Sequence, residues 1–153
     1  MVLFCYHEGD NLNNISDVFE SNNKIKCLTA GTLNSKQIAF LKEKCPDVFY
    51  KIKSYTVFIW KDRIEHIKKH SYDVSGLSTK EMIDLLPSII EEPDYLGYRT
   101  KDNSIQFIKV INGNLLVAVR ADSNGRLNFR TMYTITDGQL EDYIKKNHAW
   151  KFC

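Results

Sequence analysis

The sequence lacks the features that mark extracellular, membrane and metal-ribbon proteins. Its four cysteines lie far apart and form no Cys-x-x-Cys pair, which argues against a zinc ribbon and against a disulfide framework. No apolar run approaches the roughly 18 residues that span a bilayer, and no basic segment with an apolar run behind it marks a secretory leader. We therefore expect a cytoplasmic chain with reduced thiols and no membrane partner.

Common signatures of nucleotide-dependent and hydrolytic enzymes are missing as well. The sequence contains no Gly-rich phosphate loop, no dinucleotide-binding fingerprint, no Gly-x-Ser-x-Gly elbow and no His-Glu-x-x-His pair. The net charge is only +2, from 21 basic and 19 acidic residues, so no overall field drives the chain toward nucleic acid or a membrane. Function must therefore be inferred from local groups of residues.

Arginine is absent from the first 60 residues, where lysine supplies the positive charge. The five arginines are Arg63, Arg99, Arg120, Arg126 and Arg130. A guanidinium is a planar fork that suits phosphate, so this distribution hints at anion recognition in the second half of the chain. A chance distribution of five residues would look the same.

A chain of 153 residues with 43% hydrophobic content can bury a core and has the usual size of one domain. Residues 1–53 are expected to form a small α+β appendage. Its expected elements are strands at 2–6 and 24–29, a short helix at 16–20, and a helix after Asn34-Ser35 that Pro46 interrupts.

Residues 54–153 are expected to form the main module, with helices followed by antiparallel strands. A strand at 55–60 leads into a charged helix from Asp62, and the Ser78–Glu81 capping-box spacing begins a second helix that Pro93 ends. Strands at 104–111, 115–120 and 127–135 are joined by short turns, as in a meander, and a last helix begins at 137 or 138. This order predicts the α+β class.

Two histidines, His66 and His70, stand four residues apart in the helix expected from Asp62. Residues at this spacing share one face of a helix, so the two imidazoles could bind a metal ion together. No third ligand stands at a recognisable spacing, and we expect no metal. Histidines that end a lysine-bearing helix also complement the helix dipole, so the spacing leaves a purely structural role open.

Two strands carry a basic residue where the pattern expects an apolar one. Lys109 shares a face with Ile105 and Phe107 in an alternating strand, and Arg120 closes the apolar strand that precedes it. Both positions fit a binding site, and both equally fit a sheet edge where the charged group reaches water.

The third strand of the meander has one apolar and one polar face if it alternates regularly. Alternation places Leu127, Phe129, Thr131, Tyr133 and Ile135 on one face, and Asn128, Arg130, Met132 and Thr134 on the other. The face around Arg130 is then either a solvated surface or a shallow floor for a polar ligand.

Five blocks of the second half carry a resemblance to a known family. The blocks are Ile64-Glu-His-Ile-Lys-Lys-His70, Ile89-Ile-Glu-Glu-Pro-Asp-Tyr-Leu-Gly97, Ser104-Ile-Gln-Phe-Ile-Lys109, Leu116-Val-Ala-Val-Arg120 and Phe129-Arg-Thr-Met-Tyr133. Together, in this order and spacing, they resemble the phage-associated branch of the barnase, EndoU, colicin and RelE-like ribonuclease superfamily.

The resemblance implies a fold in which helices lie against one face of a small antiparallel sheet and the other face holds RNA. It also implies metal-free cleavage without a cofactor, in which the ribose 2′-hydroxyl attacks the adjacent phosphate and leaves a cyclic phosphate. This reaction needs a base, cations for the non-bridging oxygens and an acid for the departing 5′ oxygen. RNA is the implied partner, and a cognate inhibitor protein would fit a toxin-like role.

Carried onto this sequence, the resemblance makes His66 the first candidate for the acid or base, because imidazole titrates near neutral pH. His70 is the second candidate. Arg120 and Arg130 match the basic strand positions and would hold the phosphate through bidentate contacts.

Hydroxyl groups of the last strand complete the implied site. Thr131 and Tyr133 match a Thr-x-Tyr pair and would donate hydrogen bonds or orient the histidine. The glutamate base of barnase-type enzymes has no clear counterpart on these strands, so His66 would act alone or with Tyr133. The candidates for contacting the RNA backbone or a base are Lys109, Tyr98 and Arg99.

Two other functions remain open at this stage. The first is a catalytically inactive RNA- or protein-binding module on the same fold. The second is a metal-dependent hydrolase that uses His66 and His70.

Overall fold

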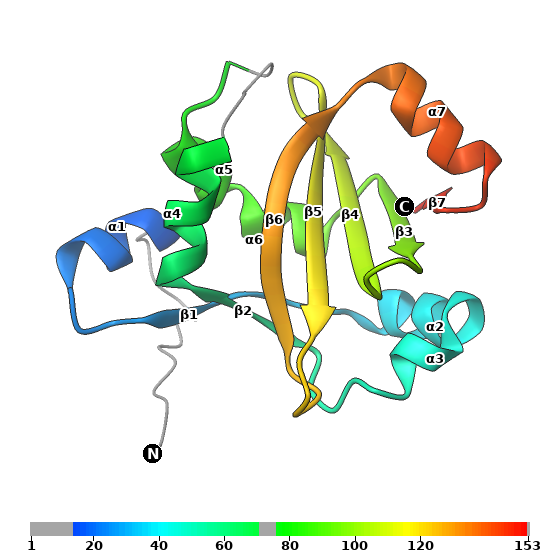
Figure 1. Cartoon of the computed structure of the whole chain (residues 1–153), viewed down its shortest axis with the longest axis horizontal. Coiled ribbons are helices and arrows are strands. Elements are labelled where there is room, and N and C mark those ends of the chain that lie inside the picture. The colour runs from blue at the N-terminus through cyan, green and yellow to red at the C-terminus, as the bar shows by residue number, and fades with distance from the viewer. Residues whose placement is uncertain (1–13, 71–75, 153) are drawn as a thin grey trace.

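The computed structural model describes residues 14–70 and 76–152 (Figure 1). Seven strands of this part form one sheet in the order β1-β2-β6-β5-β4-β3-β7. Their bounds are β1 (Cys27–Thr32), β2 (Thr56–Trp60), β3 (Tyr95–Arg99), β4 (Ser104–Val110), β5 (Asn114–Ala121), β6 (Leu127–Ile135) and β7 (Ala149–Lys151). The strand expected at 2–6 lies outside the described residues.

The α+β class is confirmed, but the expected small antiparallel sheet is wrong in size and partly in direction. The predicted meander is present as β4-β5-β6, and β3 and β7 extend it on one side. On the other side β2 joins β6 in parallel, through Val57 opposite Leu127 and Phe58 opposite Asn128. A parallel pair needs a long crossover connection, and no local turn signal in the sequence announces one.

The part of the chain that the structure describes contains seven helices, and three of them begin at a capping box. The seven helices are α1 (Ile15–Ser21), α2 (Ser35–Lys44), α3 (Pro46–Phe49), α4 (Lys61–His70), α5 (Thr79–Asp84), α6 (Leu86–Glu91) and α7 (Asp137–Lys145). Capping boxes start α2, α5 and α7, and the one at Ser78 and Glu81 was expected from the sequence. The single helix expected after Ser78 is two helices, because Pro87 lacks an N–H and its ring clashes with the preceding turn.

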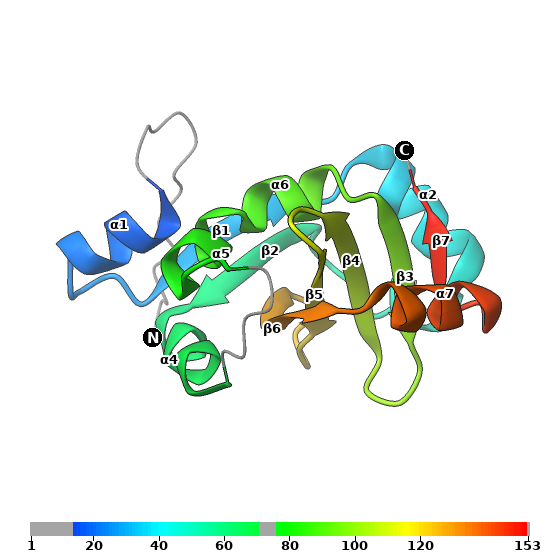
Figure 2. The same cartoon turned by 90° about the horizontal axis from the view of Figure 1, so that it is seen from above.

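Helices cover both faces of the sheet, which corrects the expectation of a single covered face. On one side α6 places Leu86 and Ile89 in the main core with Phe107 and Phe129. On the other side α7 packs Leu140 into a smaller cluster with strand residues, which are Ile108, Leu116, Ala118 and Ile135. Figure 2 shows α6 on one side of the sheet and α4 and α7 on the other, at its two ends.

The sheet and the core continue across the boundary expected near residue 53. β1 pairs with β2 in antiparallel register, and the buried Gln37 of α2 donates its amide to the carbonyl oxygen of Ile90 at 2.6 Å. The described residues before 54 therefore share the core of those after it. Among the helices of the described part, none is long and apolar enough to cross a membrane.

Gly97 is the point where β7 meets β3, and it makes the first testable prediction. A Cβ at Gly97 would collide with the carbonyl oxygen of His148, which accepts a hydrogen bond from the Tyr98 N–H at 3.1 Å. Because backbone cannot move aside as a flexible side chain does, Gly97→Ala is expected to lower the free energy of unfolding by about 2 kcal/mol or more. Denaturant titration measures the change.

The control for this prediction is Gly138→Ala. The nearest atom to a Cβ there is the Thr136 hydroxyl oxygen at 3.8 Å, an ordinary contact, and alanine favours the helical backbone. This variant should be as stable as the wild type or slightly more stable. Equal effects at both glycines would contradict the role assigned to Gly97.

Candidate functional site

The register of the sheet gathers polar side chains on the face opposite the main core. Residues paired across β3, β4, β5 and β6 form three rows on this face. The rows are Arg99, Ser104, Arg120 and Asn128; Gly97, Gln106, Ala118 and Thr131; and Tyr95, Ile108, Leu116 and Tyr133. The first two rows carry the polar groups, and the third merges with the cluster under α7.

A β-bulge in β6 places two consecutive residues on this face. Val119 pairs with Phe129 and Ala118 pairs with Thr131, so Arg130 is the extra residue. The regular alternation expected from the sequence is therefore wrong here. Phe129 lies in the main core, whereas Thr131 lies on the opposite face together with Arg130.

These side chains line a cavity of about 240 Å³, which we call the arginine pocket. Helix α4 lies beside β6 and adds Arg63 and His66 to its wall. The residues that line it are Arg63, His66, Arg99, Asp102, Ser104, Gln106, Ala118, Arg120, Arg130, Thr131 and Tyr133. Six of the expected site residues thus lie in one cavity: His66, Arg99, Arg120, Arg130, Thr131 and Tyr133.

Four of the five arginines of the chain line this pocket. Arg63 donates from Nε and Nη2 to the backbone oxygen of Arg130, at 3.1 and 2.5 Å. The guanidinium groups of Arg99, Arg120 and Arg130 have no hydrogen bond or ion pair with any residue that the structure describes. The pocket therefore offers several unpaired positive charges to a ligand.

The charges in the pocket repel one another. Burial, and after it the positive charges of Arg63 and Arg120, lower the pKa of the Arg130 guanidinium. The group still carries its proton at neutral pH because arginine ionises so strongly. An anion bound among these guanidinium groups would relieve the repulsion.

Acceptors and hydroxyl donors complete the wall. Asp102 is the one carboxylate among the described residues that line the pocket, and it accepts a hydrogen bond from the Ser104 hydroxyl at 2.7 Å. Burial, and after it the neighbouring Tyr143, raise the pKa of Tyr133. Tyr133 is therefore a neutral phenol at physiological pH and can donate a hydrogen bond.

Three predicted site residues are not among the described residues that line the pocket: Lys109, Tyr98 and His70. Lys109 lies on the opposite face and its ammonium donates to the Glu92 carbonyl oxygen at 2.6 Å. Tyr98 also faces the main core, and its hydroxyl donates to Asn103 at 2.9 Å. Alternation in β3 and β4 turns both away from the face that carries the arginine pocket. The side chain of His70 lies outside the described ones.

Five lining residues were not predicted as site residues: Arg63, Asp102, Ser104, Gln106 and Ala118. Arg63 precedes His66 by three residues, which places both on one helix face, so the sequence held a usable signal. Asp102 lies on the turn between β3 and β4, a strand pair that was not expected because β3 was missed.

The described part of the chain contains no grouped metal ligands, and its Cys45 thiol is buried. No three His, Cys, Asp or Glu side chains are grouped as metal ligands within residues 14–70 and 76–152. Burial raises the pKa of the Cys45 thiol to about 11, so this thiol is protonated at neutral pH and is a poor nucleophile.

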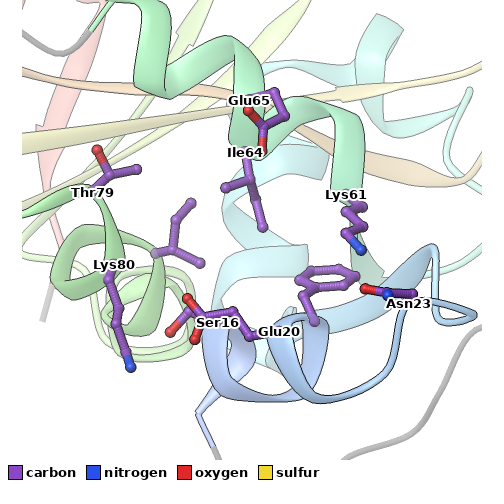
Figure 3. Close-up of a pocket in the computed structure, with 10 residues that line it drawn as sticks. Ser16, Glu20, Asn23, Lys61, Ile64, Glu65, Thr79 and Lys80 are labelled. Atoms are coloured by element: carbon purple, nitrogen blue, oxygen red, sulfur yellow. The ribbon is translucent and has the colours of Figure 1, made fainter.

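A second cavity, of about 260 Å³, lies between α1, α4 and α5. Figure 3 shows Lys61, Ile64 and Glu65 of α4 across from side chains of α1 and α5. Polar groups at its edge already have partners: Lys80 pairs with Asp17 at 2.7 Å, and the Ser16 hydroxyl donates to the Asp84 carboxylate at 2.7 Å. The unpaired guanidinium groups favour the arginine pocket as the functional site.

A cluster of guanidinium groups with a histidine on an open sheet face is chemically suited to a phosphate-bearing ligand. The model of the family described as phage-Barnase-EndoU-ColicinE5/D-RelE like nuclease 3 matches residues 29–142. This match covers most of the chain and every residue of the arginine pocket, and the chain belongs to this nuclease family. No curated protein and no solved structure matches the chain.

Proposed function

We propose that the protein is a metal-independent endoribonuclease. It would cleave RNA by letting the 2′-hydroxyl of the RNA attack the adjacent phosphate. The observation that supports this most strongly is the arginine pocket, in which cations, a histidine and hydroxyl groups surround one cavity. These are the groups that the reaction needs, and the family is one of nucleases. The 2′ oxygen forms a bond to phosphorus, the bond from phosphorus to the 5′ oxygen breaks, and a 2′,3′-cyclic phosphate remains.

The phosphate would bind between Arg120 and Arg130. Arg130 projects from the bulge, and Arg63 fixes the backbone there through its two bonds to the Arg130 carbonyl oxygen. Donors held in place before the reaction stabilise the charge that builds on the non-bridging oxygens. Thr131 and the neutral phenol of Tyr133 would add hydrogen bonds to the same oxygens.

Two groups could exchange the protons. His66 reaches the pocket from α4 beside β6, and Asp102 from the turn between β3 and β4. From β6, beside His66, to β4, which follows the Asp102 turn, the sheet order gives two strand spacings, or roughly 10 Å. One group would take the proton of the 2′-hydroxyl and the other would protonate the 5′ oxygen, and we assign His66 as the principal one.

Incubating the purified protein with total RNA in excess chelator tests this proposal. We expect the same cleavage rate with and without chelator, because the guanidinium groups supply the positive charge. The fragments should end in a 2′,3′-cyclic phosphate. The ends are identified by their resistance to phosphatase until acid opens the ring.

Other results would favour the alternatives. Activity lost in chelator and restored by a divalent ion would indicate a metal-dependent hydrolase. RNA binding without cleavage under any of these conditions would indicate an inactive binding module. A toxin-like role and a cognate inhibitor protein are further parts of this proposal, and co-expression with neighbouring genes would test them.

A further inference from the structure

One buried polar side chain lacks the hydrogen bonds that burial normally requires. The buried polar residues of the described part are Ser16, Gln37, Ser104, Gln106 and Asn114. The side chains of the other four have protein partners, but that of Gln106, only 3% exposed, has none among the residues that the structure describes. Buried amides are almost always paired, so the unpaired Gln106 amide indicates a group that binds a ligand.

Gln37 shows what a structural glutamine looks like in the same chain. It is fully buried, its amide donates to the Ile90 carbonyl oxygen at 2.6 Å, and its oxygen accepts from the Asn34 N–H at 2.8 Å. Its donor and its acceptor sides are both used. The two glutamines are therefore a matched pair, one paired within the fold and one not.

The neighbours of Gln106 in the sheet leave room beside its amide. Gly97 of β3 and Ala118 of β5 flank it in the same cross-strand row, and neither has a side chain long enough to cover it. Gln106 lines the arginine pocket and also an adjoining hollow of about 280 Å³. Its amide is thus placed at the junction of two cavities.

We call the adjoining hollow the side hollow, and it is lined by Arg99, Thr100, Lys101, Gln106, Tyr143 and His148. It shares Arg99 and Gln106 with the arginine pocket. Tyr143 of α7 supplies an aromatic ring, and its carbonyl oxygen accepts a hydrogen bond from the His148 N–H at 2.8 Å. The hollow therefore combines an aromatic ring, an unpaired amide and positive charge.

We propose that the side hollow binds the nucleobase next to the phosphate in the arginine pocket, and that Gln106 selects that base. This inference rests on the proposed function, since it takes RNA as the ligand. One sugar joins a base to its phosphate, so a base site must border the phosphate site, as the side hollow does. An amide pairs with the donor and acceptor edge of a base, and aromatic side chains stack on unpaired bases of single-stranded RNA.

Binding of small, uncleavable probes tests the inference without relying on catalysis. The probes are the 3′- and 5′-monophosphates of the four nucleosides, with inorganic phosphate as the reference, measured by calorimetry or NMR titration. In either the 3′- or the 5′-monophosphate series, the wild type should bind one nucleotide at least about tenfold more tightly than the nucleotide it binds most weakly. This is the usual discrimination of a bidentate contact to a base. Gln106→Leu should bind all four within about threefold and bind inorganic phosphate as the wild type does.

Stability gives an independent readout from the matched glutamines. Gln106→Leu should melt at or above the wild-type temperature, because it removes a buried group without partners, whereas Gln37→Leu should melt lower because it leaves two backbone groups unpaired. Gln106→Met, of similar length, repeats the binding test if leucine does not fit.

Three results would overturn the inference. Base preference that persists in both Gln106 variants would show that another group selects the base. A wild type that binds inorganic phosphate but all four nucleotides equally would leave the proposed nuclease intact and remove the base site. A wild type that binds neither phosphate nor nucleotides would overturn the proposed function itself, and this inference with it.

Discussion

His66→Ala is expected to slow RNA cleavage by about 100-fold or more, the usual size of a general acid or base contribution. His66 reaches the arginine pocket from α4, beside the strand that carries Arg130 and Thr131. Imidazole can accept and release a proton near neutral pH. The single-turnover rate with saturating protein measures the effect on the chemical step.

The melting temperature of the same variant separates catalysis from structure. If the histidines only complement the end of α4, His66→Ala and His70→Ala should each cost a little stability and leave the rate intact. If His66 transfers the proton, its variant should lose the rate while staying folded, and His70→Ala should cost less. A folded His66→Ala protein that cleaves at the wild-type rate would exclude the assignment.

Much of the local structure follows from short sequence signals. The Asn34, Ser78 and Thr136 side chains cap helices as their residue types favour, and the turn-rich connections produce the β4-β5-β6 meander. The arginine distribution was only a weak hint of anion recognition. The fold brings four of the five arginines to one cavity. The caps and the turns each act within a few residues, which is why they can be predicted from one sequence.

The features that were missed depend on contacts between distant residues. The bulge at Arg130 adds one residue to a strand, and alternation cannot show where such an insertion falls. β3 contains Gly97, which is unfavourable in an isolated strand and is required only because the His148 backbone approaches it. Lys109 breaks the alternating pattern for a structural reason, since its ammonium donates to the carbonyl oxygen of Glu92, the C-cap residue of α6.

The pairing of the residues before 54 also depends on contacts with distant residues and could not be predicted. β1 forms the edge of the sheet beside β2, and Gly31 lies against Ile90, where a Cβ would be 3.1 Å from its Cγ2 atom. No spacing or turn signal in the first 53 residues indicates that pairing. The family match, which begins at residue 29, also includes most of β1.

Arg130→Gln is expected to slow cleavage on the order of 100-fold, as removal of a prearranged oxyanion donor does. Arg130 is the extra residue of the bulge, and its guanidinium has no partner among the described residues. The charge that gathers on the non-bridging oxygens would be its partner in the transition state. Arg126→Gln is the matched control, because Arg126 lies outside the pocket and pairs with Asp122 at 3.4 Å.

Salt dependence tests whether the lost contact is to phosphate. Each phosphate contact on single-stranded RNA contributes about −0.7 to the slope of log affinity against log salt. Arg130→Gln should flatten the slope by about that amount, and Arg126→Gln should leave it unchanged. An unchanged slope in Arg130→Gln would show that this arginine is structural.

Lysine at the same position separates charge from geometry. Arg130→Lys keeps the positive charge and should restore the salt slope, but it loses the planar fork and should recover only part of the rate. Neither variant should unfold the protein, because Arg63 binds the backbone oxygen of residue 130, which every substitution retains. Removing the charge should even raise the melting temperature, since the neighbouring charges of Arg63 and Arg120 help to lower the pKa of Arg130 in the native protein. A glutamine variant that is slower, more stable and less sensitive to salt would identify Arg130 as a group kept for binding phosphate at a cost in stability.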